Sequence, residues 1–299
     1  MNGELSIKSI DSSNYNAMAK AMGISLDNDS NSVIKLPRLK IENESIMRDS
    51  KIDGKKVKEE IMEAGSFKLS LPEDENVFYG KSVVVRIFMQ RFMYKKFFMD
   101  TKKYGKSVFS DNFNVDLKDT LGTFNLGRPL GFQRDWNSLP EELRNTIKSV
   151  KRVRALFGKI DYIGKVVDST LNEVKFEETP FIWEIDNATG FKNMGIPLTS
   201  LAKQQLIPIN HNISIVTQEN VMNNGNSFYT PVPTLDTTKT VDITDNDQLL
   251  FTQFREFIEN YNGWVVKEWE KNVVEEDISD EDRDIVDNFV DIEMDEESK

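Results

Sequence analysis

Apolar and polar residues alternate in short runs through the middle of the chain, and residues that favour turns separate these runs. An alternation with a period of two is typical of strands that bury one face. The Asn224-Gly225 pair separates the last two runs and suits the positive φ angles of a tight hairpin. We therefore expect strands at residues 35–41, 66–71, 81–99, 106–113, 152–164, 180–185, 212–217 and 227–235.

Three segments follow the helical period of three to four residues instead. The first helix is expected to begin near Ser138, because Ser138 and Glu141 have capping-box spacing and Pro140 falls in the first turn. A short helix is expected at residues 196–205. The longest helix is expected at residues 245–270, and its apolar residues are Leu249, Leu250, Phe254, Phe257, Ile258 and Tyr261.

The two ends of the chain lack both patterns. Residues 1–34 are rich in Ser, Asn and Asp, so they cannot bury enough apolar surface to offset the entropy lost on ordering. We expect a flexible arm there and a disordered acidic tail at residues 273–299. Residues 35–272 are then expected to form one domain of the α+β class, mostly β, which the long amphipathic C-terminal helix closes.

The charge of the chain is concentrated in its tail. The formal net charge is −12, and residues 275–299 contain 13 acidic residues against only Arg283 and Lys299. Residues 1–274 keep the other 36 basic and 37 acidic residues, so that part of the chain is nearly neutral. An acidic isoelectric point therefore does not argue against a polyanionic partner.

Composition indicates the redox environment and the cellular compartment in which we expect the protein to act. The chain has no cysteine, which excludes disulfides and thiolate zinc sites and favours a reducing environment. The N-terminus lacks the basic and apolar regions of a secretory signal, and no apolar stretch reaches about 18 residues. We therefore expect a cytoplasmic protein, in the host cytoplasm if the chain is viral, with no membrane partner.

Residues 81–106 combine basic and aromatic side chains. This segment contains eight Lys or Arg residues, six aromatic residues and a single acid, Asp100. At a period of two, the odd positions from Val83 to Met89 predict a core face, whereas the even positions mix aromatic rings with cations. A second run, residues 148–165, has six basic residues against one acid. Two such strands side by side would form a basic groove.

Single-stranded nucleic acid fits this mixture, because unstacked bases stack on aromatic rings and phosphates attract cations. Stacking contributes roughly 1–3 kcal/mol per base without demanding a particular sequence. The same rings are also compatible with a buried central strand whose Lys and Arg side chains reach water from its ends. The residues that we expect to bind nucleic acid are Arg86, Phe88, Arg91, Phe92, Tyr94, Lys95, Lys96, Lys102, Lys103, Tyr104, Lys106, Lys151, Arg152, Arg154 and Lys159.

The layout of residues 35–299 resembles that of phage-type single-stranded DNA-binding proteins. These proteins combine an OB-like antiparallel β-barrel and inserted helices with basic and aromatic strands and an acidic C-terminal tail. The resemblance implies that the barrel binds single-stranded DNA. It also implies that the tail competes with DNA for the groove and recruits replication proteins.

No motif in the chain indicates an enzyme. Residues 122–129 have the glycine spacing of a P-loop, but Arg128 and Pro129 replace its lysine and its hydroxyl residue. Residues 280–291 lack the glycine of a calcium-binding loop, and His211 is the only histidine. We therefore expect no catalytic residues, no metal and no cofactor.

Two functions remain open, and a third, a metal-dependent nucleic-acid enzyme, has the least support because no convergent ligands are visible in the sequence. The leading hypothesis is a sequence-tolerant single-stranded DNA-binding protein of phage DNA replication or recombination, which recruits replication proteins through its tail. The alternative is a structural or interaction protein, such as a virion or scaffold component, in which the same strands are buried and the tail only confers solubility. The residue pattern leaves open whether the protein forms a homo-oligomer.

Overall fold

The computed structural model describes most of the chain. The expected N-terminal arm and almost the whole acidic tail lie outside the described residues, as does Asn224 of the expected hairpin turn. The described residues are 35–52, 55–72, 76–131, 136–222 and 225–273.

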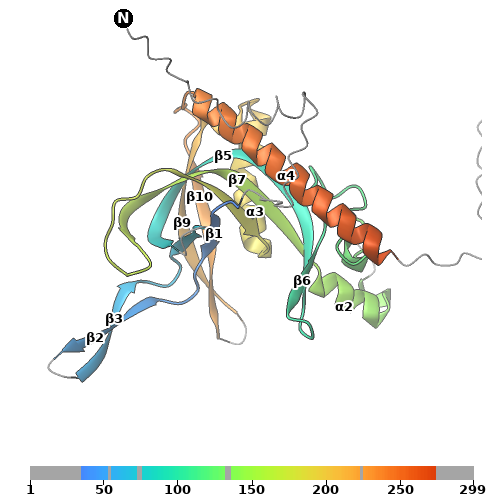
Figure 1. The fold of residues 1–299 in the computed structure, drawn as a ribbon, viewed down its shortest axis with the longest axis horizontal. Coiled ribbons are helices and arrows are strands. Elements are labelled where there is room, and N and C mark those ends of the chain that lie inside the picture. Colours follow the sequence, from blue (N-terminus) through green and yellow to red (C-terminus); the bar gives the residue numbers. More distant parts are fainter. Residues whose placement is uncertain (1–34, 53–54, 73–75, 132–135, 223–224, 274–299) are drawn as a thin grey trace, which may run out of the picture. The chain divides into compact units, whose positions relative to one another are not determined.

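The described part of the chain is mostly β, as expected, with three α-helices (Figure 1). Its strands are β1 (Arg38–Ile41), β2 (Ile46–Ile52), β3 (Lys55–Met62), β4 (Phe67–Ser70), β5 (Val77–Phe98), β6 (Lys103–Lys106), β7 (Lys151–Val167), β8 (Thr179–Ile185), β9 (Asn212–Val221) and β10 (Ser227–Leu235). Its helices are α2 (Glu141–Ser149), α3 (Ala188–Lys203) and α4 (Asp245–Asn272).

Five strands close into a ring in the order β5, β4, β1, β8 and β7, because β7 also pairs with β5. Neighbours in the ring are antiparallel, except that β1 and β8 are parallel where the ring closes. The ring strands follow one another in chain order. Strand β9 pairs with β5 at Val83–Arg86, on the edge opposite β7 and beyond β4, and β10 pairs with β9, whereas β2 and β3 form a separate two-stranded sheet.

Strand β5 is the longest strand, at 22 residues, and it pairs with β4, β6, β7 and β9. Its pairing with β7 contains a bulge between Ile87 and Met89. Because a bulge adds a residue to one strand only, the alternation of faces shifts by one at this point. Val83 and Val85 therefore belong to one core cluster, whereas Met89 and Met93 belong to another.

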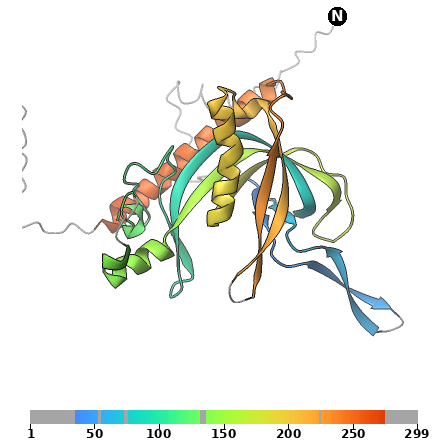
Figure 2. The same ribbon diagram turned by 180° about the vertical axis from the view of Figure 1, so that it is seen from behind.

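These two clusters lie on opposite sides of the β5–β7 pair. The first cluster includes Phe67 of β4 and Phe181 of β8, and it fills the ring. The second cluster lies between the pair and α4, and it includes Phe254 and Phe257. Figures 1 and 2 show α4 and α3 on opposite sides of β5 and β7. The long C-terminal helix thus covers one face of the pair, as the apolar period of residues 245–270 predicts.

Helix α3 starts at Ala188, well before the expected segment 196–205. The side chain of Asn187 caps this helix by accepting a hydrogen bond from the Gly190 N–H at 3.0 Å. Glycines at positions 190 and 195 lower the helix propensity of the first half of α3. The sequence therefore did not indicate a helix in this half. No helix within the described ranges is both long and apolar enough to cross a bilayer.

The fold differs from the expected elements in three further ways. Strands β2 and β3 were not expected, because residues 46–62 are rich in charged side chains. Of the expected strand at 106–113, only Lys106 lies in β6, and isolated bridges occur beyond it. The N-cap of α2 is Pro140, without a side-chain cap, so the predicted helix start at Ser138 is wrong.

Candidate nucleic-acid interface

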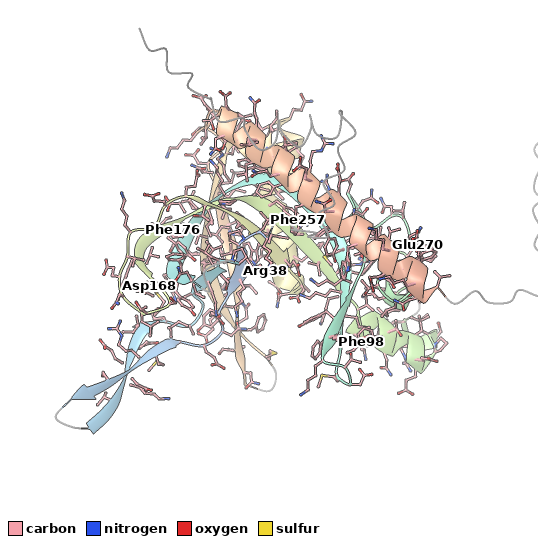
Figure 3. The ribbon with its side chains drawn as sticks, viewed as in Figure 1. Arg38, Phe98, Asp168, Phe176, Phe257 and Glu270 are labelled. Carbon is pink, nitrogen blue, oxygen red and sulfur yellow. The ribbon has the colours of Figure 1, made fainter. Side chains whose placement is uncertain are left out.

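The end of β5 and the whole of β6 form a hairpin that carries exposed aromatic rings. We call the side chains of residues 95–106 the hairpin surface. Phe97 and Tyr104 are cross-strand partners, and their ring centroids lie 4.8 Å apart. The two residues are 41% and 53% exposed, respectively. Figure 3 shows Phe98 at the same end of β5.

Cations accompany these rings. Nζ of Lys95 lies 4.5 Å from the centroid of the Tyr104 ring, and Nζ of Lys96 lies 5.1 Å from that of Phe98. The hairpin surface contains a single acidic residue, so its cations are not neutralised from within it. Its most exposed lysines, at the turn, are Lys102 and Lys103.

The local sequence explains the geometry of this hairpin. The φ angle of Lys102 is +53°, which is the left-handed conformation that tight turns use. At Gly105, an added Cβ would lie 2.9 Å from the Phe98 ring and 3.1 Å from Leu126. Glycine is therefore required at this position for the ring to pack over β6.

Lys95 and Lys106 share one carboxylate with Arg38. Oε2 of Glu184 lies 3.2 Å from Nζ of Lys95, and Oε1 lies 3.4 Å from Nζ of Lys106. Oε1 is also 3.1 Å from Nη1 of Arg38. Burial alone would raise the pKa of Glu184, but the positive charges of these three residues outweigh it and lower the pKa to about 2. Three cations face one carboxylate, so the cluster stays positive beneath the hairpin surface.

A second group of rings lies farther along the sheet. The guanidinium carbon of Arg154 lies 5.2 Å from the ring centroid of Phe92 and 4.4 Å from that of Phe191. Arg152 lies 5.4 Å from the ring of Phe113, which in turn contacts Phe92. The three rings are half-buried. Rings and arginines therefore alternate in this group, and the arginines lie over the rings.

Three of the predicted residues lie beneath α4 instead. Nη2 of Arg86 is 2.5 Å from Oδ2 of Asp247, and Nζ of Lys159 is 2.8 Å from Oδ1 of the same carboxylate. Phe88 is buried against Phe254, with ring centroids 5.9 Å apart. Burial alone would raise the pKa of Asp247, but hydrogen bonds from these cations and from the α4 N-cap lower it. These residues fix α4 to the sheet.

Two further predicted residues are engaged within the protein. Tyr94 is fully buried, and its ring centroid lies 4.8 Å from that of Phe113. Arg91 pairs with Asp111, with 3.0 Å between Nη1 and Oδ1. The even positions of residues 81–99 therefore do not share one face, because the bulge in β5 redirects them.

The structure thus divides the fifteen predicted residues by their accessibility. Exposed or half-exposed at the hairpin end are Lys96, Lys102, Lys103, Tyr104 and Lys151. Mostly buried on Glu184 are Lys95 and Lys106. In or beside the second ring group are Phe92, Arg152 and Arg154. Paired or buried elsewhere are Arg86, Phe88, Arg91, Tyr94 and Lys159.

Reasoning from the sequence missed several residues of these surfaces. Phe97 alternates with Lys95, so the same period of two that indicated its neighbours could have included it. Phe113 and Phe191 come from a loop and from α3, and no local pattern connects either residue to β5 or β7. Only the fold brings these two rings together.

Comparisons of the chain with protein-family models, with curated proteins and with solved structures found no match.

Proposed function

We propose that the protein binds single-stranded DNA without strict sequence preference, with the hairpin surface as its main contact, and acts in DNA replication or recombination. The observation that carries this proposal is the pair of exposed rings in contact, Phe97 and Tyr104, among the lysines of a segment that itself contains one acid. An unstacked base can cover such a ring, and the phosphate next to it can meet a lysine.

This surface chemistry favours single strands over duplexes. In a duplex the bases already stack on one another, so an exposed ring gains no base contact without melting a pair. A single strand offers both a base and a phosphate at each step. Each phosphate that a lysine neutralises releases about 0.7 counterion from single-stranded DNA, so the affinity should fall steeply as salt rises.

The likeness to OB-type single-strand binders is part of this proposal. The ring has five strands, as an OB barrel does, but it connects them in chain order, whereas an OB barrel is a Greek key. The proposal therefore depends on the chemistry of the surface. The acidic tail, with its net charge of −11 from 13 acids against two basic residues, would act as internal competitor and as binding segment for replication proteins.

The test is a titration of the full chain with labelled single-stranded and duplex oligonucleotides, followed by fluorescence anisotropy at two salt concentrations. The double variant Lys102→Glu/Lys103→Glu should lose at least about tenfold in single-strand affinity at low salt. The matched control is Lys175→Glu/Lys267→Glu, which makes the same change in net charge at two exposed lysines outside the hairpin surface.

Two results would contradict the proposal. One is the absence of single-strand binding by the wild-type chain at low salt, which is the outcome that a virion or scaffold component predicts. The other is an equal loss of affinity in the test and control variants, which would show that overall charge rather than the hairpin surface governs binding.

A further inference from the structure

A pocket of 580 Å³ lies beside the second ring group, between β7 and one side of α3. We call it the α3 pocket. Its wall consists of Arg154 from β7 and of adjacent residue pairs that recur every four residues along α3, from 191 to 203. The opposite side of α3 packs on the sheet, where Met194 and Leu201 are fully buried. Pockets of this size are large enough to hold a small ligand.

Arg154 is a buried cation in the wall of this pocket. Only 9% of the residue is exposed. Its Nε donates a hydrogen bond to the carbonyl oxygen of Phe191 at 3.0 Å, and its Nη1 donates to Oε1 of Gln90. Burial lowers the pKa of Arg154 to about 10, so the side chain keeps its charge at neutral pH.

This cation has no counter-charge among the described residues. Buried charges in proteins are normally paired, because removing an isolated charge from water is costly. Within the described ranges, no carboxylate lies within ion-pairing distance of the Arg154 guanidinium, whereas Arg86 and Arg91 each have an aspartate partner. Nη2 likewise has no hydrogen-bond acceptor among these residues. An anion in the pocket would supply both a counter-charge for Arg154 and a hydrogen-bond acceptor for its Nη2.

The backbone of α3 is shaped to admit this guanidinium. An added Cβ at Gly195 would lie 2.6 Å from Nη2 of Arg154 and 3.1 Å from its Cζ. A glycine inside a helix is unfavourable relative to alanine. Glycine at this position therefore lowers the helix propensity of α3, but it leaves room for Arg154 to approach the pocket closely.

The rest of the pocket matches an anion with more than one acceptor oxygen. Lys192 and Lys203 also line it and are exposed, and none of the described residues in its wall is acidic. A phosphate group offers several acceptor oxygens and up to two negative charges, which suits a pocket with three cations in its wall. Phe191 and Ile196, the latter 58% exposed, add apolar surface for the remainder of the ligand.

We propose that the α3 pocket binds the phosphate group of a nucleotide, with Arg154, Lys192 and Lys203 on the phosphate and Phe191 beside the base or sugar. The site is separate from the hairpin surface and does not depend on it. The phosphate can come from a free mononucleotide, from the end of a strand or from within a strand, and the experiment distinguishes these sources.

The first measurement is isothermal titration calorimetry of the full chain with deoxyadenosine monophosphate, inorganic pyrophosphate and deoxyadenosine. The monophosphate and pyrophosphate should bind, and deoxyadenosine should bind at least about tenfold more weakly than its monophosphate, because it lacks the charged acceptor. Equal affinities for deoxyadenosine and its monophosphate, or no binding of either phosphate compound, would overturn the proposal.

The second measurement repeats this titration with Gly195→Ala, which displaces the Arg154 guanidinium while it retains the charge. We expect about a tenfold loss of affinity for the monophosphate. The matched control is Gly263→Ala in α4, where an added Cβ meets nothing within 4 Å and the gain in helix propensity is the same. Circular dichroism checks that both variants fold.

Lys192→Gln/Lys203→Gln tests the same site through exposed residues, and it should also weaken binding of the monophosphate. If Gly195→Ala and this double variant both keep the wild-type affinity, the proposal is wrong. Lys102→Glu/Lys103→Glu should bind the monophosphate as the wild type does. The binding of the monophosphate therefore tests the α3 pocket independently of the proposal for the hairpin surface.

The source of the phosphate follows from competition with oligonucleotides. If only a 5′-phosphorylated oligonucleotide displaces the monophosphate, the pocket binds strand ends. If the unphosphorylated oligonucleotide displaces it equally, the pocket binds phosphates within the strand. If neither does, the ligand is the free mononucleotide. Each of these results supports a phosphate site and assigns its source.

Discussion

Glu184 is a single side chain whose pKa depends on the three cations around it. Its pKa of about 2 lies below the ordinary value of 4.5, so the folded protein binds a proton at this carboxylate less readily than the unfolded chain does. A lowered pKa contributes stability above about pH 4.5, and this contribution is lost as the pH falls toward 2. At pH 7 the contribution amounts to about 3 kcal/mol.

Glu184→Gln should therefore reduce the free energy of unfolding at pH 7 by about 2–4 kcal/mol, and the difference from the wild type should shrink between pH 4.5 and 2. Urea denaturation at several pH values measures this. Glu256→Gln, at an exposed position of α4, serves as control and should change stability little. A constant difference at all pH values would contradict the assigned cause.

Asp247 is the residue that joins the start of α4 to the sheet. Asp247→Asn leaves the buried Arg86 without its anion and leaves Lys159 with Glu178 alone, so we expect a loss of about 3–5 kcal/mol in unfolding free energy. Asp245→Asn, at an exposed position in the same helical turn, should cost less than about 1 kcal/mol. Similar losses in the two variants, measured by chemical denaturation, would show that only the helix dipole matters.

At the scale of elements, the hairpin of β5 and β6 has the rings that a base could cover. Phe97→Ala/Tyr104→Ala should weaken single-strand binding by about 1–3 kcal/mol for each base that loses its ring, with little change in thermal stability. Phe251→Ala/Trp264→Ala removes two comparably exposed rings from α4 and should leave affinity unchanged. If the hairpin variant instead unfolds and the α4 variant weakens binding, the interface lies on α4.

The same scale shows how far the sequence predicts the elements. The long helix and most ring strands follow from periodicity, because each buries a continuous apolar face. The faces of β5 could not be predicted beyond Ile87, since one extra residue exchanges them and leaves no mark in composition. The first half of α3 was hidden by two glycines, and one of them, Gly195, is explained only by Arg154, which is distant in sequence.

At the scale of the whole molecule, the charge of the tail is a feature of the sequence alone. A segment with a net charge of −11, tethered to a positive surface, has an effective concentration on the order of millimolar. Deleting residues 275–299 should therefore tighten single-strand binding at low salt. The effect should fade as salt rises, because the Debye length shortens to about 10 Å at about 0.1 M.

The matched control for the deletion is a tail of the same composition in shuffled order, which should behave as the wild type if charge alone competes. Equal affinity of the truncated and full chains at low salt would exclude the internal competitor.

The sequence predicted the basic segment from which the candidate surfaces arise. It could not predict which cations remain accessible, because Glu184 and Asp247 pair with several of them from other elements.

Strand β5 also determines how the molecule would respond to mechanical force. The hairpin surface and the ring belong to one continuous strand, and β7 runs antiparallel to β5 along most of it. Tension applied along β5 would load the hydrogen bonds to β7 together, in shear. A strand peeled from its end would instead break those bonds one at a time. Single-molecule pulling along β5 should thus require a higher force than pulling across β9 and β10.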